Sequence, residues 1–72
     1  MRLSDLRIGT LAVLDHFPVS PLHSKMLSMG MLPGQQISVV RKVPLRGSLY
    51  VKVNDRLIAL RFREAQNIMV HL

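Results

Sequence analysis

Residues 20–42, which read S-P-L-H-S-K-M-L-S-M-G-M-L-P-G-Q-Q-I-S-V-V-R-K, carry the signals that decide the fold. Ser20 is a good helix N-cap, because its hydroxyl can accept a hydrogen bond from a backbone N–H of the first turn. Pro21 then occupies the first helical position, where its fixed φ suits a helix and its missing N–H has no consequence. Gly30 can adopt the left-handed conformation that commonly ends a helix. These residues predict a helix that begins at Pro21 and ends just before Gly30.

A turn and a strand follow this helix. Pro33 and Gly34 fit the two central positions of a type II turn, in which the second residue needs a positive φ. Beyond the turn, Ile37 and Val39 alternate with polar neighbours, which is the period of a half-buried strand. We therefore expect a strand over residues 36–43, so that the whole stretch reads helix, turn, strand.

The rest of the chain alternates short apolar segments with turn signals. Further strands are predicted over residues 10–15, 49–53, 56–61 and 68–72. Before the first strand, residues 3–9 are predicted to form one capped turn, with Ser4 as the cap and Gly9 as the exit. The other connecting segments are predicted to be a connector at 16–19, a loop at 44–48, a hairpin turn at Asn54 and Asp55, and a helical turn at 63–67.

Five short strands with one helix inserted after the first predict a mainly β fold, in a single domain over residues 1–72. We expect a small, partly closed antiparallel barrel, because closure covers the sheet edges that so short a chain could not otherwise protect. An open α+β sheet with the helix across one face is the alternative. The two differ in how the last strand pairs.

The charge of the chain is its one unusual bulk property. Ten Lys and Arg residues stand against four Asp and Glu residues, giving a formal net charge of +6. Such an excess indicates an acidic partner, which could be nucleic acid, an anionic membrane or an acidic protein surface. The basic residues are dispersed, however, and Arg41-Lys42 is the only adjacent pair. A well-solvated surface explains the charge at least as well as a specific basic patch does.

The sequence offers little for catalysis. The four acidic residues are scattered, there is no cysteine, and no Gly-rich loop precedes the predicted helix as a phosphate-binding loop would. The serines in or beside the helix lack the context of a nucleophile elbow. We therefore expect a protein that is not an enzyme and that uses no cofactor.

Metal ligands and membrane segments are equally sparse. His16, His23 and His71, with Asp15 beside His16, are the candidate metal ligands, but none of the histidines has the i, i+4 spacing of a helical metal pair. We interpret them as ordinary surface histidines and expect no bound metal. The apolar runs are far shorter than the roughly 20 residues of a membrane span, and no apolar secretory segment follows Met1. The expected location is the cytoplasm.

The stretch K-M-L-S-M-G-M-L-P-G-Q-Q-I-S-V-V-R-K-V-P-L, residues 25–45, resembles the FeoA family, whose pattern includes L-G-[LM]-x-P-G followed by a strand and a short Pro-containing loop. The opening L-S-D-L-x-x-G at residues 3–9 and the ending I-A-L-R at residues 58–61 are also similar. This sequence departs from the pattern in its short helix, in His23-Ser24 where more charge is usual, and in lacking a second proline after Gly47.

The resemblance implies an SH3-like barrel of the bacterial cytosol that accompanies FeoB, a membrane ferrous-iron transporter with a cytosolic GTP-binding domain. A similar barrel forms the C-terminal module of iron-dependent repressors. We accordingly expect an accessory or regulatory protein of ferrous-iron uptake that binds the cytosolic part of a FeoB-type transporter.

The predicted helix offers a surface for such a partner. Its apolar residues cover an arc of about 160° at 100° per residue, which is more than so small a core needs. We assign Leu22 and Met26 to the core and expect an exposed edge near Leu27, Met31 and Leu32, although a Met and Leu stripe of this kind is more often entirely core than an interface. Basic residues near the end of the second strand could steer an acidic partner. The candidate partner-binding residues are Lys25, Leu27, Met31, Leu32, Arg41, Lys42 and Arg46.

Two other classes of function remain as alternatives. A basic small barrel that binds nucleic acid would account for the charge, and its binding would depend steeply on salt. A metal-binding regulatory protein would use His16 or His71. Our primary hypothesis instead expects no nucleic-acid partner and no membrane insertion, and it admits weak self-association into a homo-oligomer.

Overall fold

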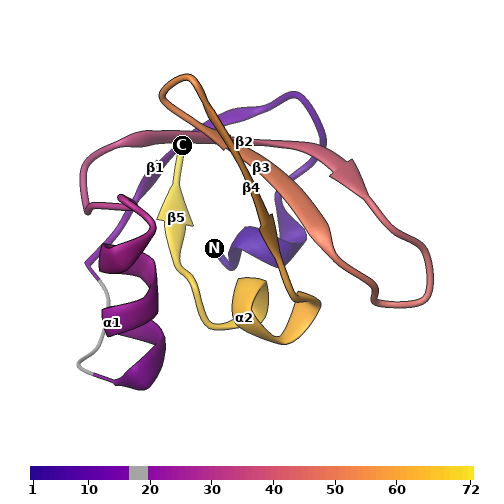
Figure 1. Cartoon of the computed structure of the whole chain (residues 1–72). Helices are drawn as coiled ribbons and strands as arrows, with labels where there is room; N and C mark the ends of the chain where they lie inside the picture. The colour runs from indigo at the N-terminus through magenta and orange to yellow at the C-terminus, as the bar shows by residue number, and fades with distance from the viewer. Residues whose placement is uncertain (17–19) are drawn as a thin grey trace.

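The computed structural model describes residues 1–16 and 20–72 of the chain (Figure 1). Its elements, in chain order, are the 3-10 helix η1 (Leu3–Asp5), β1 (Leu11–Leu14), α1 (Pro21–Ser28), β2 (Gln36–Lys42), β3 (Leu49–Val53), β4 (Arg56–Leu60), α2 (Phe62–Gln66) and β5 (Val70–His71). All five predicted strands and both predicted helical segments are therefore present. The predicted connector at residues 16–19 falls mostly on residues 17–19, which lie outside the described residues.

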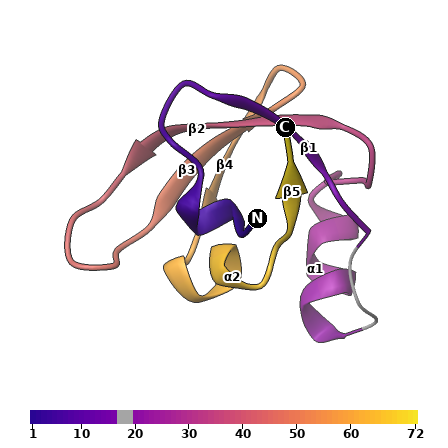
Figure 2. The same ribbon diagram turned by 180° about the vertical axis from the view of Figure 1, so that it is seen from behind.

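The five strands form one antiparallel sheet in the order β4-β3-β2-β1-β5. The register joins Ala12 to Ile37, Val39 to Val51, and Val51 to Ile58. The last strand pairs with the first, because Leu14 lies opposite Val70. The sheet curls so that β4 and β5 both reach α2, which connects them (Figures 1 and 2). The prediction of a mainly β, barrel-like antiparallel sheet with one inserted helix is confirmed.

Different elements lie at the two ends of the molecule. In both views α1 lies to one side, near β1 and β5, while the loop between β2 and β3 extends at the opposite side (Figures 1 and 2). At the open end of the barrel, η1 packs against α2. The helix therefore covers no face of an open sheet, which was the alternative architecture.

The core forms where the alternating residues of the strands point inward. In β2 the apolar residues Ile37 and Val39 are fully buried, as the period of two predicted. Half-buried side chains of Leu22, Met29 and Phe62 pack against this core. Among the described residues, the buried apolar side chains are Leu3, Leu6, Ala12, Leu14, Met26, Met31, Ile37, Val39, Leu49, Val51, Val53, Ile58, Leu60, Ala65, Ile68 and Val70.

The predicted caps of α1 and the predicted turn after it are present in the structure. The Ser20 hydroxyl accepts a hydrogen bond from the His23 N–H at 3.2 Å, which caps the helix. Gly30 has a φ of +80° and Gly34 a φ of +89°, the left-handed conformations that their positions require. The turn at Pro33 and Gly34 closes through a 3.2 Å hydrogen bond from the Gln35 N–H to the Leu32 carbonyl.

Two predicted details are wrong at the ends of the chain. Ser4 does not cap a helical turn but lies inside η1 with a buried side chain, because η1 begins two residues earlier than a cap at Ser4 would place it, so that Leu3 and Leu6 both enter the core. The last strand is also shorter than predicted. Ile68 is buried before β5 begins, and Leu72 lies beyond it with a largely exposed side chain.

Candidate partner-binding surfaces

The predicted partner-binding residues separate into two groups. Lys25, Leu27 and Leu32 lie on α1 or in the turn after it, whereas the basic residues of β2 and of the β2–β3 loop lie on the other side of the sheet (Figures 1 and 2). The longest dimension of the molecule is 29 Å. The structure therefore does not bring these residues together into one surface.

The first group contains two exposed leucines, Leu27 and Leu32, which we call the apolar ledge. Their exposed fractions are 42% and 47%, although both are large apolar side chains. Leu32 is held in place by its backbone, since its N–H donates to Gln35 Oε1 at 2.8 Å. Exposed apolar side chains on a fixed backbone are suited to contact with another protein.

Met31 does not belong to this ledge, and the prediction that it lies at an exposed edge is wrong. Its side chain is fully buried, and its N–H donates to the Met26 carbonyl at 3.0 Å. The left-handed conformation of Gly30 turns the chain back toward the barrel after the helix. The helical period therefore stops at Gly30, and Met31 enters the core beside Met26.

Lys25 is engaged within the chain. Its ammonium group forms a salt bridge with the Glu64 carboxylate, which joins α1 to α2. Glu64 also accepts a 2.9 Å hydrogen bond from the Arg61 N–H at the start of α2. Partial burial raises the pKa of Glu64, but the hydrogen bonds and the positive charges of Lys25 and Arg61 outweigh it and hold the pKa below its ordinary value of 4.5.

The second group of predicted residues has three different environments. The Arg41 guanidinium lies 5.9 Å from the ring centre of Tyr50, an exposed cation–π contact. Lys42 is half-buried, and its ammonium group donates to the Ser4 carbonyl at 3.1 Å, so it ties β2 to η1. Arg46 is exposed in the β2–β3 loop and lies 5.8 Å from the ring centre of Phe62.

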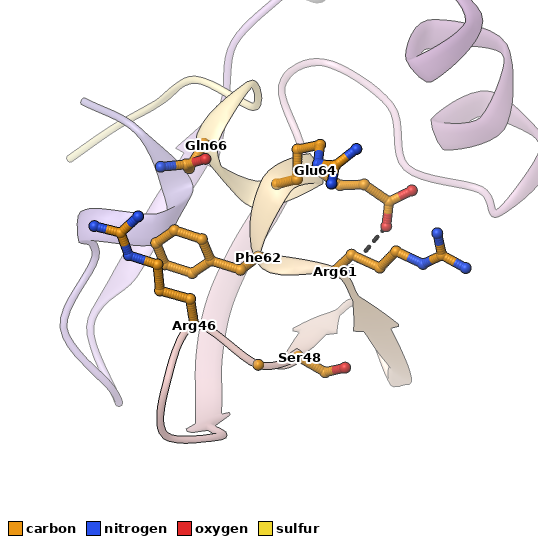
Figure 3. Close-up of a pocket in the computed structure, with 8 residues that line it drawn as sticks. Arg46, Ser48, Arg61, Phe62, Glu64 and Gln66 are labelled. Carbon is orange, nitrogen blue, oxygen red and sulfur yellow. Dashed lines mark hydrogen bonds between the residues drawn. The ribbon is translucent and has the colours of Figure 1, made fainter.

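Arg46 also borders a cleft that the sequence did not reveal. The cleft has a volume of about 660 Å³ and lies between the β2–β3 loop and α2 (Figure 3). Its lining residues are Arg46, Gly47, Ser48, Arg61, Phe62, Arg63, Glu64 and Gln66. The only local signal for it is the run Arg61-Phe62-Arg63, which flanks an aromatic side chain with two cations. Nothing in the linear sequence joins that run to Arg46.

The candidate metal ligands lie mainly near the ends of β1 and β5. His71 Nδ1 contacts Asp15 Oδ1, His16 is exposed, and His23 lies on α1. Within residues 1–16 and 20–72, no three His, Asp or Glu side chains gather closely enough to hold a metal ion. Over the same residues, no helix has the length and apolar character needed to cross a bilayer.

Comparison with known proteins places this geometry in a family. The model of the FeoA domain family matches residues 1–72. The Fe(2+) transport protein A/Fe(2+) transporter FeoB fusion protein of Porphyromonas gingivalis is 37% identical over 73 aligned residues. That alignment includes all of this chain, but the chain spans only 9% of the length of this curated relative.

Solved structures agree with this match. The solution structure of iron(II) transport protein A from Clostridium thermocellum is 40% identical, with a TM-score of 0.91 over all of this chain and 45% of that one. The zinc complex of Stenotrophomonas maltophilia FeoA, described as a procaryotic SH3 domain protein, is 29% identical. Its TM-score is 0.77 over 97% of this chain and 88% of that one. The SH3-like architecture is thereby confirmed.

Proposed function

This chain belongs to the FeoA domain family, and we propose that it is an accessory protein of bacterial ferrous-iron uptake that binds the cytosolic part of a FeoB-type transporter. The observation that carries this proposal is the P. gingivalis relative, in which a Fe(2+) transport protein A and a FeoB transporter are fused in one chain. Fusion holds two modules at a high effective concentration. Separate chains that act together need a contact surface to achieve the same association.

The apolar ledge supports this proposal as the contact surface. Leu27 and Leu32 keep close to half of their side-chain surface in water, although burial of that surface would be favourable at about 25 cal/mol per Å². Each ledge residue directly follows a buried methionine in the sequence, since Met26 precedes Leu27 and Met31 precedes Leu32. A partner that covers the ledge would therefore meet apolar side chains whose backbone is already fixed.

The proposal also treats the chain as cytoplasmic and non-enzymatic. Two of the four acidic residues are engaged within the fold, since Glu64 pairs with Lys25 and caps α2, while Asp15 contacts His71. Carboxylates held in this way serve the structure. The engagement of Glu64 in a helix cap and a salt bridge is in keeping with a role in binding.

The decisive experiment replaces Leu27 by Gln and measures binding to the purified cytosolic domain of the cognate transporter. We expect Leu27→Gln to weaken binding by about 2 kcal/mol, the effect of losing a central apolar anchor. Its free energy of unfolding should change by less than about 0.5 kcal/mol, because the side chain is exposed. Isothermal titration and thermal melts would measure the two quantities.

Leu57→Gln is the matched control. Leu57 lies on β4, outside α1 and the turn that follows it, and is 66% exposed, so the same substitution there should leave binding unchanged. Equal losses in the two variants would show that the ledge is not the contact. Retention of duplex DNA at physiological salt, or stoichiometric uptake of Fe²⁺ that His71→Ala abolishes, would favour the nucleic-acid or the metal-binding alternative instead.

A further inference from the structure

The cleft between the β2–β3 loop and α2 has an unbalanced positive charge. Arg46, Arg61 and Arg63 line it, and Glu64 is its only acidic residue. The Glu64 carboxylate is already paired with the Lys25 ammonium group and with the Arg61 N–H. Three arginines therefore line the cleft against one carboxylate, which is shared with Lys25 and on which the positive charge of Arg61 also acts.

The arginines are spread along the cleft rather than gathered at one point. Arg46 and Arg61 extend in opposite directions from the two sides of Phe62 (Figure 3). A site for one phosphate group needs donors that converge on its oxygens. Donors that diverge on either side of a ring instead fit an extended ligand that carries several separate anionic groups.

The floor of the cleft is apolar between these charges. The ring of Phe62 is half-buried against the core, and Arg46 lies over it with its guanidinium 5.8 Å from the ring centre. A stacked guanidinium keeps its N–H edges available for a carboxylate. Ser48 and Gln66 add neutral hydrogen-bonding groups at the rim (Figure 3).

We propose that this cleft binds an acidic peptide segment in which carboxylates flank an apolar side chain. The carboxylates would pair with Arg46 and Arg61, and the apolar side chain would pack beside Phe62. This inference deepens the proposed function, and rests on it in assigning the segment to the transporter. The cleft would provide a salt-sensitive contact separate from the apolar ledge, since neither Leu27 nor Leu32 lines it.

A direct test uses the whole chain, labelled with ¹⁵N, and a synthetic peptide of sequence Glu-Glu-Leu-Glu-Glu at low salt. We expect the peptide to shift the backbone amide signals of Ser48, Phe62 and Gln66. Arg46→Gln and Arg61→Gln should each weaken binding by about tenfold, because each removes a charge-assisted pair. Thermal melts would verify that both variants remain folded, as expected for exposed side chains.

Lys52→Gln is the matched control. It removes the same unit of charge from an exposed position on β3 that does not line the cleft, and it should change affinity by less than about twofold. Equal weakening by Lys52→Gln would overturn the site, since only the net charge would then matter. Equal binding of the peptide Gln-Gln-Leu-Gln-Gln would overturn the role of the carboxylates. If inorganic phosphate or duplex DNA displaced the peptide and bound the cleft more tightly than the peptide does, the cleft would be assigned to phosphate groups and the peptide assignment would be overturned.

This test contains no transporter, so its failure is distinguishable from failure of the proposed function. Peptide binding without transporter binding would uphold the cleft and reject the partner. Transporter binding that depends on Leu27, together with no peptide binding, would uphold the partner and reject the cleft.

Discussion

The α1 side and the β2–β3 side of this small barrel are held in place by different means. The α1 helix takes part in no strand ladder, and Met26 is its one fully buried residue in the structure described. On the other side, β2 and β3 are joined by an antiparallel ladder with one register shift between Val39 and Arg41. Cation–π contacts hold Arg41 and Arg46 against aromatic rings. One side therefore depends on a few buried side chains, and the other depends on backbone hydrogen bonds.

This difference corresponds to the kind of surface that each side presents. The α1 side exposes the apolar residues Leu27 and Leu32, each of which directly follows a buried methionine in the sequence. The β2–β3 side presents arginines around a cleft with an aromatic floor. An apolar contact mainly contributes affinity, whereas a charged contact mainly contributes orientation and rate of association. Two separate surfaces of unlike chemistry are thus available on one barrel.

The largest effect that we predict comes from truncating a buried side chain on the α1 side. Met31→Ala should destabilise the fold by about 2–5 kcal/mol, because it leaves a cavity in the core. A domain of this size has only about 5–15 kcal/mol of stability in total, so the variant should melt at a much lower temperature. Calorimetry or urea unfolding would measure the loss.

Leu32→Ala is the control for this change, since it alters the next residue along the chain. Leu32 is 47% exposed, and its substitution should change the free energy of unfolding by less than about 0.5 kcal/mol. If both variants lost similar stability, the α1 side would be held by more than its buried methionines and the contrast between the two sides would fail.

Met31 also illustrates where prediction from the sequence ends. The caps and turns of α1, and the alternation in β2, are local signals, and the structure follows them at Ser20, Gly30 and Gly34. The direction of Met31 depends on how the chain continues after a left-handed residue, to which the helical period no longer applies. The number of strands was therefore predictable, whereas the burial of this side chain was not.

The basic cleft was unpredictable for a different reason. Arg46 and Arg61 are fifteen positions apart in the sequence, and a hairpin lies between them. Both residues line one cleft only because the β2–β3 loop lies beside the start of α2. Such a contact is long-range, and neither residue carries a local signal of it. Lys42, which was predicted to face a partner, donates instead to the Ser4 carbonyl for the same reason.

A smaller effect is expected at Gly34, where the α1 side joins β2. Gly34→Val should destabilise the fold by more than about 1 kcal/mol, because the φ of +89° strains any β-branched residue. A Cβ there would meet no atom within 4 Å, so the loss would come from backbone conformation alone. Gly34→Asn should recover much of it, since Asn tolerates a positive φ. Thermal melts would compare the two variants.

Gly47, in the β2–β3 loop, provides the contrasting case. Its φ is not in the left-handed region, but a Cβ would lie 2.6 Å from Cγ1 of Val43. Gly47→Asn should therefore be at least as damaging as Gly47→Ala, because crowding rather than φ limits this position. Recovery by Asn at both glycines would show that the two sides impose the same kind of backbone constraint.

The smallest effect concerns the salt bridge that fastens α1 to α2. Lys25→Gln, Glu64→Gln and the double variant should reveal a coupling of about 0.2–1 kcal/mol at pH 7, as expected for a partly exposed pair. Because the pKa of Glu64 is lowered in the folded state, this stability is fully present above the ordinary pKa of 4.5 and is lost as the pH falls through the folded value. In Lys25→Gln the folded pKa of Glu64 should rise toward its ordinary value, so the loss should begin at the same pH but end at a higher pH and be smaller. Unfolding measured from pH 7 to pH 3 would test this, and an acid profile identical to that of the unaltered chain would mean that the buried methionines alone hold α1 to the barrel.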